Sequence, residues 1–465
     1  MILYRSILYR TICNRTVWYS TIRYGIKGRS NMIFSMAENL VRDSFSAAMQ
    51  EATRARKSDA AKRLDYYHDF QTDYIKDALA AHFSNPEKLT PCFVNIVRKV
   101  INRLAMVYVQ DARRKVEGTD RDQEIFSEIE RGAWLGAKWK LANRYSKLLG
   151  LVAMRPVWRN GALDVDLVTP DILDVTVGDS PEDVRSFMVT NYPESGRQDE
   201  LTYSLWTHEA FKRLDYRGHE MAVEPNPYGT IPYQTVWNRV PTDSFWTPGA
   251  SDLVTIQESF NEKLTDLLYV LRMQGFGVGY VKGMKGELSN VDPGTFFNLP
   301  ADGELGYAAT NAPVTESLAV LDFLLKQAAV SNGLPASSLT TDPTDESGVA
   351  KVAGNIELEE LRRDDVELFR AYERRLFRLI KTVWNHHNPG RKFSEKAELV
   401  VDFFDQKPNI SADKQAETWD RLLTMGVISP VDIMLERNPD LTRDEAKARL
   451  VEIQDENREF LETKI

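Results

Sequence analysis

The stretch that decides the fold runs from Ser347 to Trp384 and reads SGVAKVAGNIELEELRRDDVELFRAYERRLFRLIKTVW. It contains no proline, and the apolar residues of its second half recur at intervals of three, four or seven, as on one face of an α-helix. These apolar residues are Leu361, Leu368, Tyr372, Leu376, Leu379 and Val383. At a rise of about 1.5 Å per residue the helix would be roughly 50 Å long, longer than a compact domain usually needs. Taken alone, the stretch favours a surface helix of an all-α domain, so the rest of the chain must decide.

The residues before this helix are polar and acidic. They read TTDPTDESG at positions 340–348, and either Asp345 or Ser347 is placed to cap the first helical turn. The helix itself starts with small residues and ends with bulky and charged ones. A loop that meets a long helix is therefore expected near residue 348.

Composition limits the classes of protein to which the chain can belong. Its 465 residues are enough for two to four domains, and 43% are hydrophobic, as in ordinary globular proteins. The net charge is −9, whereas a protein that reads DNA sequence is normally basic. An acidic surface still allows DNA to pass without adhesion, because few counterions would be released on contact. Two cysteines, Cys13 and Cys92, give no disulfide framework, and no run of eighteen apolar residues predicts a membrane span.

Residues 1–31 differ from the rest because they carry arginine and lysine but no acidic residue. This pattern is compatible with a transit peptide or a membrane-surface helix. We favour a third interpretation, an extension upstream of a true start at Met32 or Met36, because an ordinary helical sequence begins there. We expect this tail to be poorly ordered and assign it no function.

The chain then changes from helical to β-rich character at Leu151. Helical patterns fill residues 36–149, and Trp134 and Trp139 are expected to anchor the core. Alternating runs joined by Asn160-Gly161 predict a β-hairpin, with further short strands to about residue 225. Four aspartates in this region could be taken for metal ligands, but a solvated strand face is favoured because no histidine accompanies them. These aspartates are Asp164, Asp166, Asp171 and Asp174.

Two helices that bracket a glycine-rich segment follow, at 251–275 and 314–333. The segment between them contains only short strand patterns, so the three pieces predict a stalk with a small β tip. After the long helix we expect a strand in AELVVDFFD, at 397–405, and then three helices. The signals for these helices include Gly426 as a stop and a capping box of Thr442 and Glu445.

Motifs of enzymatic chemistry are absent from the sequence. It has no GxxxxGK[ST] phosphate loop, no GxSxG nucleophile elbow and no HExxH zinc helix. The pair His386-His387 is better explained as a cap favoured by the helix dipole than as a metal site. The pair Asp364-Asp365 is interpreted as a solvated helix face. The sequence therefore offers no catalytic, cofactor-binding or metal-binding residues.

Several segments, taken in order, resemble the bacteriophage portal proteins of the siphophage type. The segments that carry this resemblance are RLDYYHDF (63–70), NIVRKVINRLAMVYV (95–109), VTPDILDV (168–175), NPYGTIPYQTVWN (226–238), ESFNEKLTDLL (258–268), GLPASSL (333–339), SGVAKV (347–352) and LLTMGVISPVDIMLERNPDLTRDEAKARLVEIQDE (422–456). They span about residues 60–460. The arginine-rich tail has no counterpart in the resemblance, and the C-terminal part is short compared with larger portals.

The resemblance implies an α+β, mainly α, portal-type fold in a ring of about twelve copies at one vertex of the capsid. The implied regions are the wing at 32–250, stem helices at 251–275 and 314–333, the clip at 276–313, the tunnel loop at 334–350, the long wing helix at 351–388 and a helical crown at 389–465. The ring would be a channel for packaging and ejecting double-stranded DNA without reading its sequence.

The resemblance also implies two sets of site residues. Those expected to line the channel are Thr340, Thr341, Asp342, Thr344, Asp345, Glu346, Ser347, Gly348 and Lys351. Those expected in the clip are Gly277, Tyr280, Lys282, Lys285, Phe296 and Phe297. Among these channel residues Asp342, Asp345 and Glu346 are acidic and no base precedes Lys351, so repeated copies would keep DNA sliding rather than bound.

The partners implied are further copies of the chain, DNA, the terminase motor, the major capsid and scaffolding proteins and the head-completion adaptor. No membrane or cofactor is implied, and the protein would be assembled in the host cytoplasm and reside in the virion. Two other hypotheses remain open at this point. One is a helical scaffold or adaptor of a large assembly, and the other is an enzyme with an unrecognised site.

Overall fold

Helices and antiparallel sheets alternate along the chain in the computed structural model. The structure describes residues 44–82, 89–276, 278–282, 304–308, 313–339, 348–403, 412–438 and 441–462. The expected mixed α+β fold with mainly helical content is confirmed in these residues. The chain divides into two units, the first ending at Phe404 and the second beginning at Asp405. None of the described helices is long and apolar enough to cross a membrane.

Helices dominate the described chain before the two main sheets. They are α3 (Glu51–Tyr67), α4 (Thr72–His82), α5 (Ile96–Leu104), α6 (Asp120–Gly132) and α7 (Leu135–Leu149). Helix α6 has a complete capping box, in which Thr119 Oγ1 accepts from the Asp122 backbone N–H and the Asp122 carboxylate accepts from the Thr119 backbone N–H. The Asp122 carboxylate also accepts from the backbone and hydroxyl of Ser394, which ties the start of α6 to the segment after α10.

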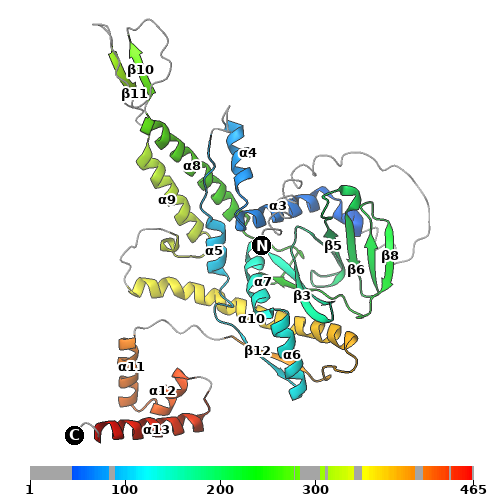
Figure 1. Cartoon of the computed structure of the whole chain (residues 1–465), viewed down its shortest axis with the longest axis vertical. Coiled ribbons are helices and arrows are strands. Elements are labelled where there is room, and N and C mark those ends of the chain that lie inside the picture. Colours follow the sequence, from blue (N-terminus) through cyan, green and yellow to red (C-terminus); the bar gives the residue numbers. More distant parts are fainter. Residues whose placement is uncertain are drawn as a thin grey trace. The chain divides into compact units, whose positions relative to one another are not determined.

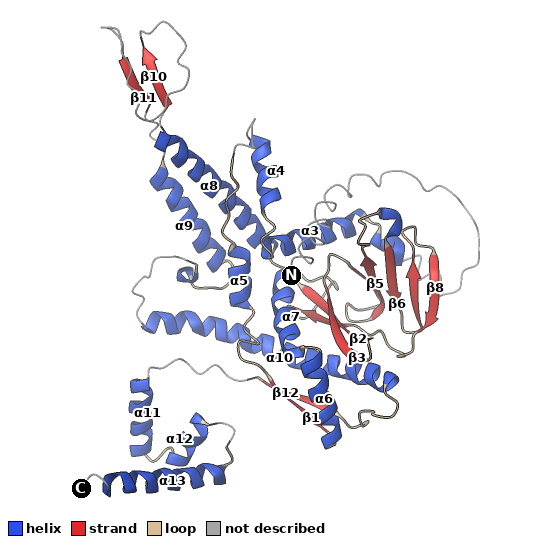
Figure 2. Ribbon diagram, in the orientation of Figure 1, coloured by secondary structure: helices blue, strands red, loops and turns tan. Residues whose placement is uncertain are grey.

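Two sheets form the β-rich region (Figure 2). The first has the order β3-β2-β9, with β2 at Leu151–Arg159, β3 at Ala162–Val168 and β9 at Gln234–Trp237. The second has the order β4-β5-β6-β7-β8, with strands at Leu173–Val177, Val184–Asn191, Thr202–Trp206, Ala210–Leu214 and Glu220–Pro225. The predicted hairpin is confirmed, because β2 and β3 pair antiparallel and both turn residues have positive φ, +52° at Asn160 and +77° at Gly161.

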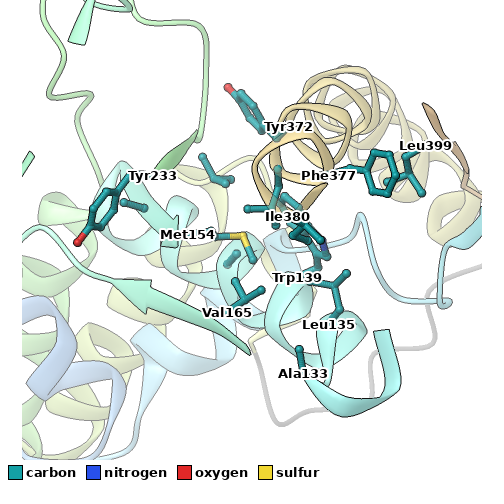
Figure 3. Close-up of a cluster of buried hydrophobic side chains, with 14 of the residues drawn as sticks. Ala133, Leu135, Trp139, Met154, Val165, Tyr233, Tyr372, Phe377, Ile380 and Leu399 are labelled. Carbon is teal, nitrogen blue, oxygen red and sulfur yellow. The ribbon is translucent and has the colours of Figure 1, made fainter. Parts of the chain in front are cut away.

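The long helix α10 (Gly348–His387) forms one wall of the main core. It has 40 residues and is therefore about 60 Å long. Its buried side packs against β2, β9 and β12 (Glu398–Asp402), and β12 pairs with β1 (Arg113–Glu117). Figure 3 shows Phe377 and Ile380 of this helix beside Trp139 and Leu399. The long helix predicted from the sequence is thus held by a sheet on one side, unlike a helix of an all-α domain.

Strand β12 belongs to the first unit, whereas the crown implied by the resemblance begins at residue 389. The second unit contains α11 (Ala412–Thr424), α12 (Pro430–Arg437) and α13 (Arg443–Glu462). The predicted capping box is present, since Thr442 N and Oγ1 both donate to Glu445 Oε2. Gly426 follows α11 with φ +70°, as expected for a helix stop.

The prediction that both Trp134 and Trp139 anchor the core is wrong for Trp134. Trp139 is buried, but Trp134 is 74% exposed. Trp134 has φ +52° at the corner between α6 and α7, so the helical phase is broken there and the side chain is directed outward. A helical periodicity that ignores this corner places the residue on the wrong face.

Three carboxylates predicted to be solvated are instead buried. Asp171 and Asp174 are 6% and 7% exposed, and Asp174 pairs with Arg56 and Lys57 of α3. Asp365 is also buried and accepts from Lys147 Nζ at 2.8 Å. The cations come from distant elements, so local spacing could not reveal them. Nowhere in the described chain do three or more His, Cys, Asp or Glu residues form a possible metal cluster.

A stalk follows the sheets, as the sequence predicts. Helix α8 (Ser251–Phe276) and helix α9 (Val314–Val330) pack side by side, and between them in sequence lie β10 (Val278–Lys282) and β11 (Glu304–Ala308) (Figure 1). The two strands pair antiparallel, with Tyr280 opposite Gly306 and Lys282 opposite Glu304.

Candidate functional site: the stem helices and their base

The base of α8 carries a row of buried polar side chains, Gln257, Asn261 and Thr265, one turn apart. Gln257 Oε1 accepts from the backbone N–H of Ile96 at 2.7 Å and of Val97 at 3.3 Å. The Ile96 N–H also donates to Val94 O at 2.9 Å, whereas the Val97 N–H is among those left unpaired at the start of a helix, so Gln257 acts as a cap for α5 supplied by another element.

The rest of this row extends the hydrogen bonding along the segment before α5. Gln257 Nε2 donates to Val94 O at 2.8 Å and to Asn261 Oδ1 at 2.7 Å. Thr265 Oγ1 accepts from Cys92 N at 3.2 Å, and Asn261 Nδ2 donates to Gln71 Oε1 at 2.8 Å. Since buried polar groups are costly when unpaired, these bonds fix the position of α8 relative to Gln71 and to residues 92–97.

Asn95 joins the start of α5 to the end of α3 by further hydrogen bonds. Its Oδ1 accepts from Arg98 N at 2.7 Å, which makes it the N-cap of α5. Its Nδ2 donates to Tyr66 O at 2.9 Å and to Asp69 Oδ1 at 2.7 Å, which fastens the end of α3. The stem is therefore held at its base by directed hydrogen bonds as well as by apolar packing.

Farther along α8 the apolar face continues, but its side chains are no longer buried by other elements. Leu264 is half-buried, whereas Leu268 and Leu271, next along the same helical face, are 44% and 42% exposed. Helix α9 exposes a second apolar face through Val320, Phe323 and Val330. We call these five exposed residues the stem surface. Neighbouring exposed apolar side chains of this kind mark a site of protein association in soluble proteins.

The channel and clip residues expected from the sequence are only partly placed. Thr340, Thr341, Asp342, Thr344, Asp345, Glu346 and Ser347, together with Gly277, Lys285, Phe296 and Phe297, lie outside the described residues. Gly348 and Lys351 lie in the first turn of α10, and Tyr280 and Lys282 lie in β10. The roles proposed for all of them stay predictions.

Sequence reasoning missed the polar row of α8, although a signal was present. Gln257, Asn261 and Thr265 interrupt the apolar side of the helix at a spacing of four residues, which marks them as facing the packed side. Polar residues that recur on an apolar helical face are either unpaired or hydrogen-bonded to another element. Gln257 and Thr265 are hydrogen-bonded to backbone groups of residues 92–97.

The expected role of His386-His387 as a helix cap stays a prediction; both lie in the last turn of α10, where His387 makes further contacts. Its ring stacks on Trp158 with centroids 5.1 Å apart, and its Nε2 lies 3.0 Å from the Tyr228 hydroxyl oxygen. Burial and the neighbouring His386 lower the pKa of His387, which favours the neutral ring. This histidine therefore joins the end of α10 to the β-rich region through packing and one hydrogen bond.

Comparison with known proteins gives one family match and several distant structural likenesses. The model of the family described as "Phage portal protein, SPP1 Gp6-like" matches residues 53–459. No curated protein sequence matches the chain.

Among solved structures, a chain from the virion of a native gene transfer agent (GTA) particle is 12% identical. The match covers 78% of this chain and 91% of that one, at a TM-score of 0.40. A chain from the neck of an empty GTA particle, computed with C6 symmetry, is 14% identical. Here 74% of this chain and 89% of that chain are covered, at a TM-score of 0.45.

Proposed function

Because this chain belongs to the SPP1 Gp6-like family of phage portal proteins, we propose that it forms a ring of about twelve copies that conducts the viral genome at one capsid vertex. Portal proteins are structural proteins and not enzymes. The ring would be a component of the virion, assembled in the host cytoplasm, and would act as a channel in packaging and ejection.

The stem surface is the observation that carries this proposal. Its five apolar side chains are between 42% and 58% exposed in a single chain, which would be unfavourable if the chain stayed alone in water. Contact between α8 or α9 and the stem of the next copy would bury them. At about 25 cal/mol per Å² of apolar surface, several such residues at each contact stabilise a ring substantially, although association costs offset part of this.

The base of the stem supports the same proposal because a ring needs rigid subunits. The polar row of α8 fixes the stem to α5 and to the end of α3, so the orientation of the stem surface is set before assembly. A heterologous contact closes into a ring only when each copy presents its two faces at a constant angle.

The proposed channel lies at residues 340–348 and Lys351, and the proposed clip lies at Tyr280, Lys282 and their neighbours. Asp342, Asp345 and Glu346 would form a repeated acidic collar that repels phosphate, which keeps DNA mobile. The clip would meet the terminase motor and later the head-completion adaptor, while the wing would meet the major capsid and scaffolding proteins. Deleting residues 341–346 is expected to leave rings intact and to impair packaging or retention of DNA.

The proposal is tested by placing a charge on the stem surface. Phe323→Asp should reduce or abolish ring formation, as measured by mass photometry, while the circular dichroism spectrum stays that of the wild type. Met221→Asp is the matched control, because Met221 is also largely exposed but lies on β8, away from the stem helices. If both variants form rings as readily as the wild type, the stem surface is not a contact between copies.

A further inference from the structure

One face of α10 carries basic side chains that form no ion pair with a carboxylate of the described residues. Arg370, Arg374, Arg378 and Lys381 follow each other at intervals of three or four residues, so they form a row on one side of the helix. Arg374 and Arg378 are exposed, and Arg370 and Lys381 are half-buried. The row covers about 16 Å along the helix axis.

The interactions of the two outer residues hold their positions without cancelling their charges. Arg370 Nε donates to the backbone oxygen of Val401 at 3.4 Å. Lys381 Nζ donates to the backbone oxygens of Glu395 at 3.1 Å and Ala397 at 3.2 Å. Carbonyl oxygens carry only partial charge, so both cations keep most of their field toward solvent.

Among the described residues, no carboxylate lies within ion-pair distance of Arg374 or Arg378. The nearby Glu373 is buried and bound by Arg114, and Glu182 lies 3.8 Å from Arg375 rather than from the row. The row is thus a local run of four positive charges on a protein whose net charge is −9, and the exposed Glu367, one turn before Arg370, is the carboxylate at its N-terminal end. Such a local contrast is the electrostatic pattern of a polyanion site.

The chemistry of the row favours a phosphate backbone over another protein. The described residues between 362 and 403 include no exposed large hydrophobic side chain, whereas the centres of protein interfaces are apolar and depleted of charge. Arginine matches phosphate oxygens in a bidentate way, and one DNA strand presents a phosphate about every 3.4 Å along the axis. Four cations spread over about 16 Å can therefore face successive phosphates of one strand.

We propose that the row Arg370–Arg374–Arg378–Lys381 binds the phosphate backbone of duplex DNA without reading its sequence. This contact is separate from the acidic collar proposed for the channel, which repels DNA. The row lies in the second half of α10, remote in sequence from the collar residues at its start. Binding at the row would hold genome DNA against the portal outside the channel.

The test uses the full-length protein and a mixed-sequence duplex of 30 base pairs, with binding followed by fluorescence anisotropy from 0.1 to 0.4 M NaCl. The variant Arg374→Gln/Arg378→Gln removes two phosphate contacts. The salt slope of log K should then become shallower by about 1.8, because each contact contributes about 0.9. The contribution of the two contacts vanishes on extrapolation to 1 M salt. At 0.1 M salt the variant should therefore bind the duplex about 60-fold more weakly than the wild type.

The matched control is Arg213→Gln/Arg217→Gln, which removes the same charge from exposed positions on β7 and the turn after it. The inference requires the control to bind as the wild type does. The inference is overturned if the row variant binds DNA as tightly as the control variant, whether both bind like the wild type or both lose affinity equally. Loss of ring mass with unchanged DNA binding in the row variant would show a contact between copies, which also overturns it. Ring mass is measured independently, so failure of the ring proposal stays distinguishable from failure of this one.

Discussion

The buried carboxylate of Glu373 offers a quantitative test of how α10 is held. Glu373 Oε2 accepts from Arg114 Nε at 2.6 Å, and its Oε1 accepts from Arg114 Nη2 at 2.8 Å and from the Tyr108 hydroxyl at 2.7 Å. Burial alone would lower the pKa of Arg114, but attraction to Glu373 and the hydrogen bonds outweigh it and raise that pKa. The pair joins α10 to β1.

Replacing Glu373 by leucine would leave the Arg114 guanidinium buried with Glu130 as its remaining carboxylate, at 3.0 Å. Breaking one side of a buried ion pair costs about 3–5 kcal/mol of the free energy of unfolding. The double variant Arg114→Met/Glu373→Leu removes both buried charges and leaves the buried Tyr108 hydroxyl unpaired, which costs about 1–3 kcal/mol, while Glu130, which also loses Arg114, is partly exposed and can be solvated. The double variant should therefore recover about 2 kcal/mol relative to the single one.

Urea unfolding followed by tryptophan fluorescence measures this difference, at a protein concentration where all variants have the same oligomeric mass. The midpoint should fall strongly for Glu373→Leu and partly return for the double variant. A double variant that is as unstable as, or less stable than, Glu373→Leu would refute the reasoning, because the loss would then come from packing and not from an unpaired cation.

Three further predictions concern the base of the stem, a tight corner and pH. Gln257→Leu should cost about 1–3 kcal/mol, read from the urea midpoint, because it leaves the buried backbone N–H of Val97 at the start of α5 unpaired, whereas that of Ile96 keeps Val94 O as an acceptor. Gly150→Ala should destabilise far more than Gly161→Ala in thermal melts. Both glycines have positive φ, but only at Gly150 would the new methyl clash with the backbone oxygen of Thr247. The lowered pKa of His387 means that the unfolded chain binds more protons below about pH 6.5, so its contribution to stability is complete above that pH and is lost as the pH falls. His387→Asn should make the loss of stability between pH 7 and pH 5 smaller, and an unchanged pH profile would contradict this assignment.

Local signals predicted local structure well. The Asn160-Gly161 turn and the Thr442–Glu445 capping box depend on a few adjacent residues, and the structure confirms both. The long helix could be predicted because its apolar residues recur with helical spacing over many turns. The same reasoning could not show that a sheet would cover it.

The failures come from contacts between distant segments. Asp174 was expected at the surface because its cations, Arg56 and Lys57, lie on α3 and are far away in sequence. For His387 the spacing indicated only a helix cap, because the Trp158 ring that stacks on it comes from β2. Burial and pKa depend on such tertiary neighbours, which no spacing within one segment specifies.

The account's central claim is that copies of this chain associate into a ring through their stems. The most direct measurement is the mass of the purified full-length protein in solution. Twelve chains of 53.1 kDa predict a species of about 640 kDa, and images of it should show a central channel. A protein that stays below ten subunits under all conditions would contradict the claim.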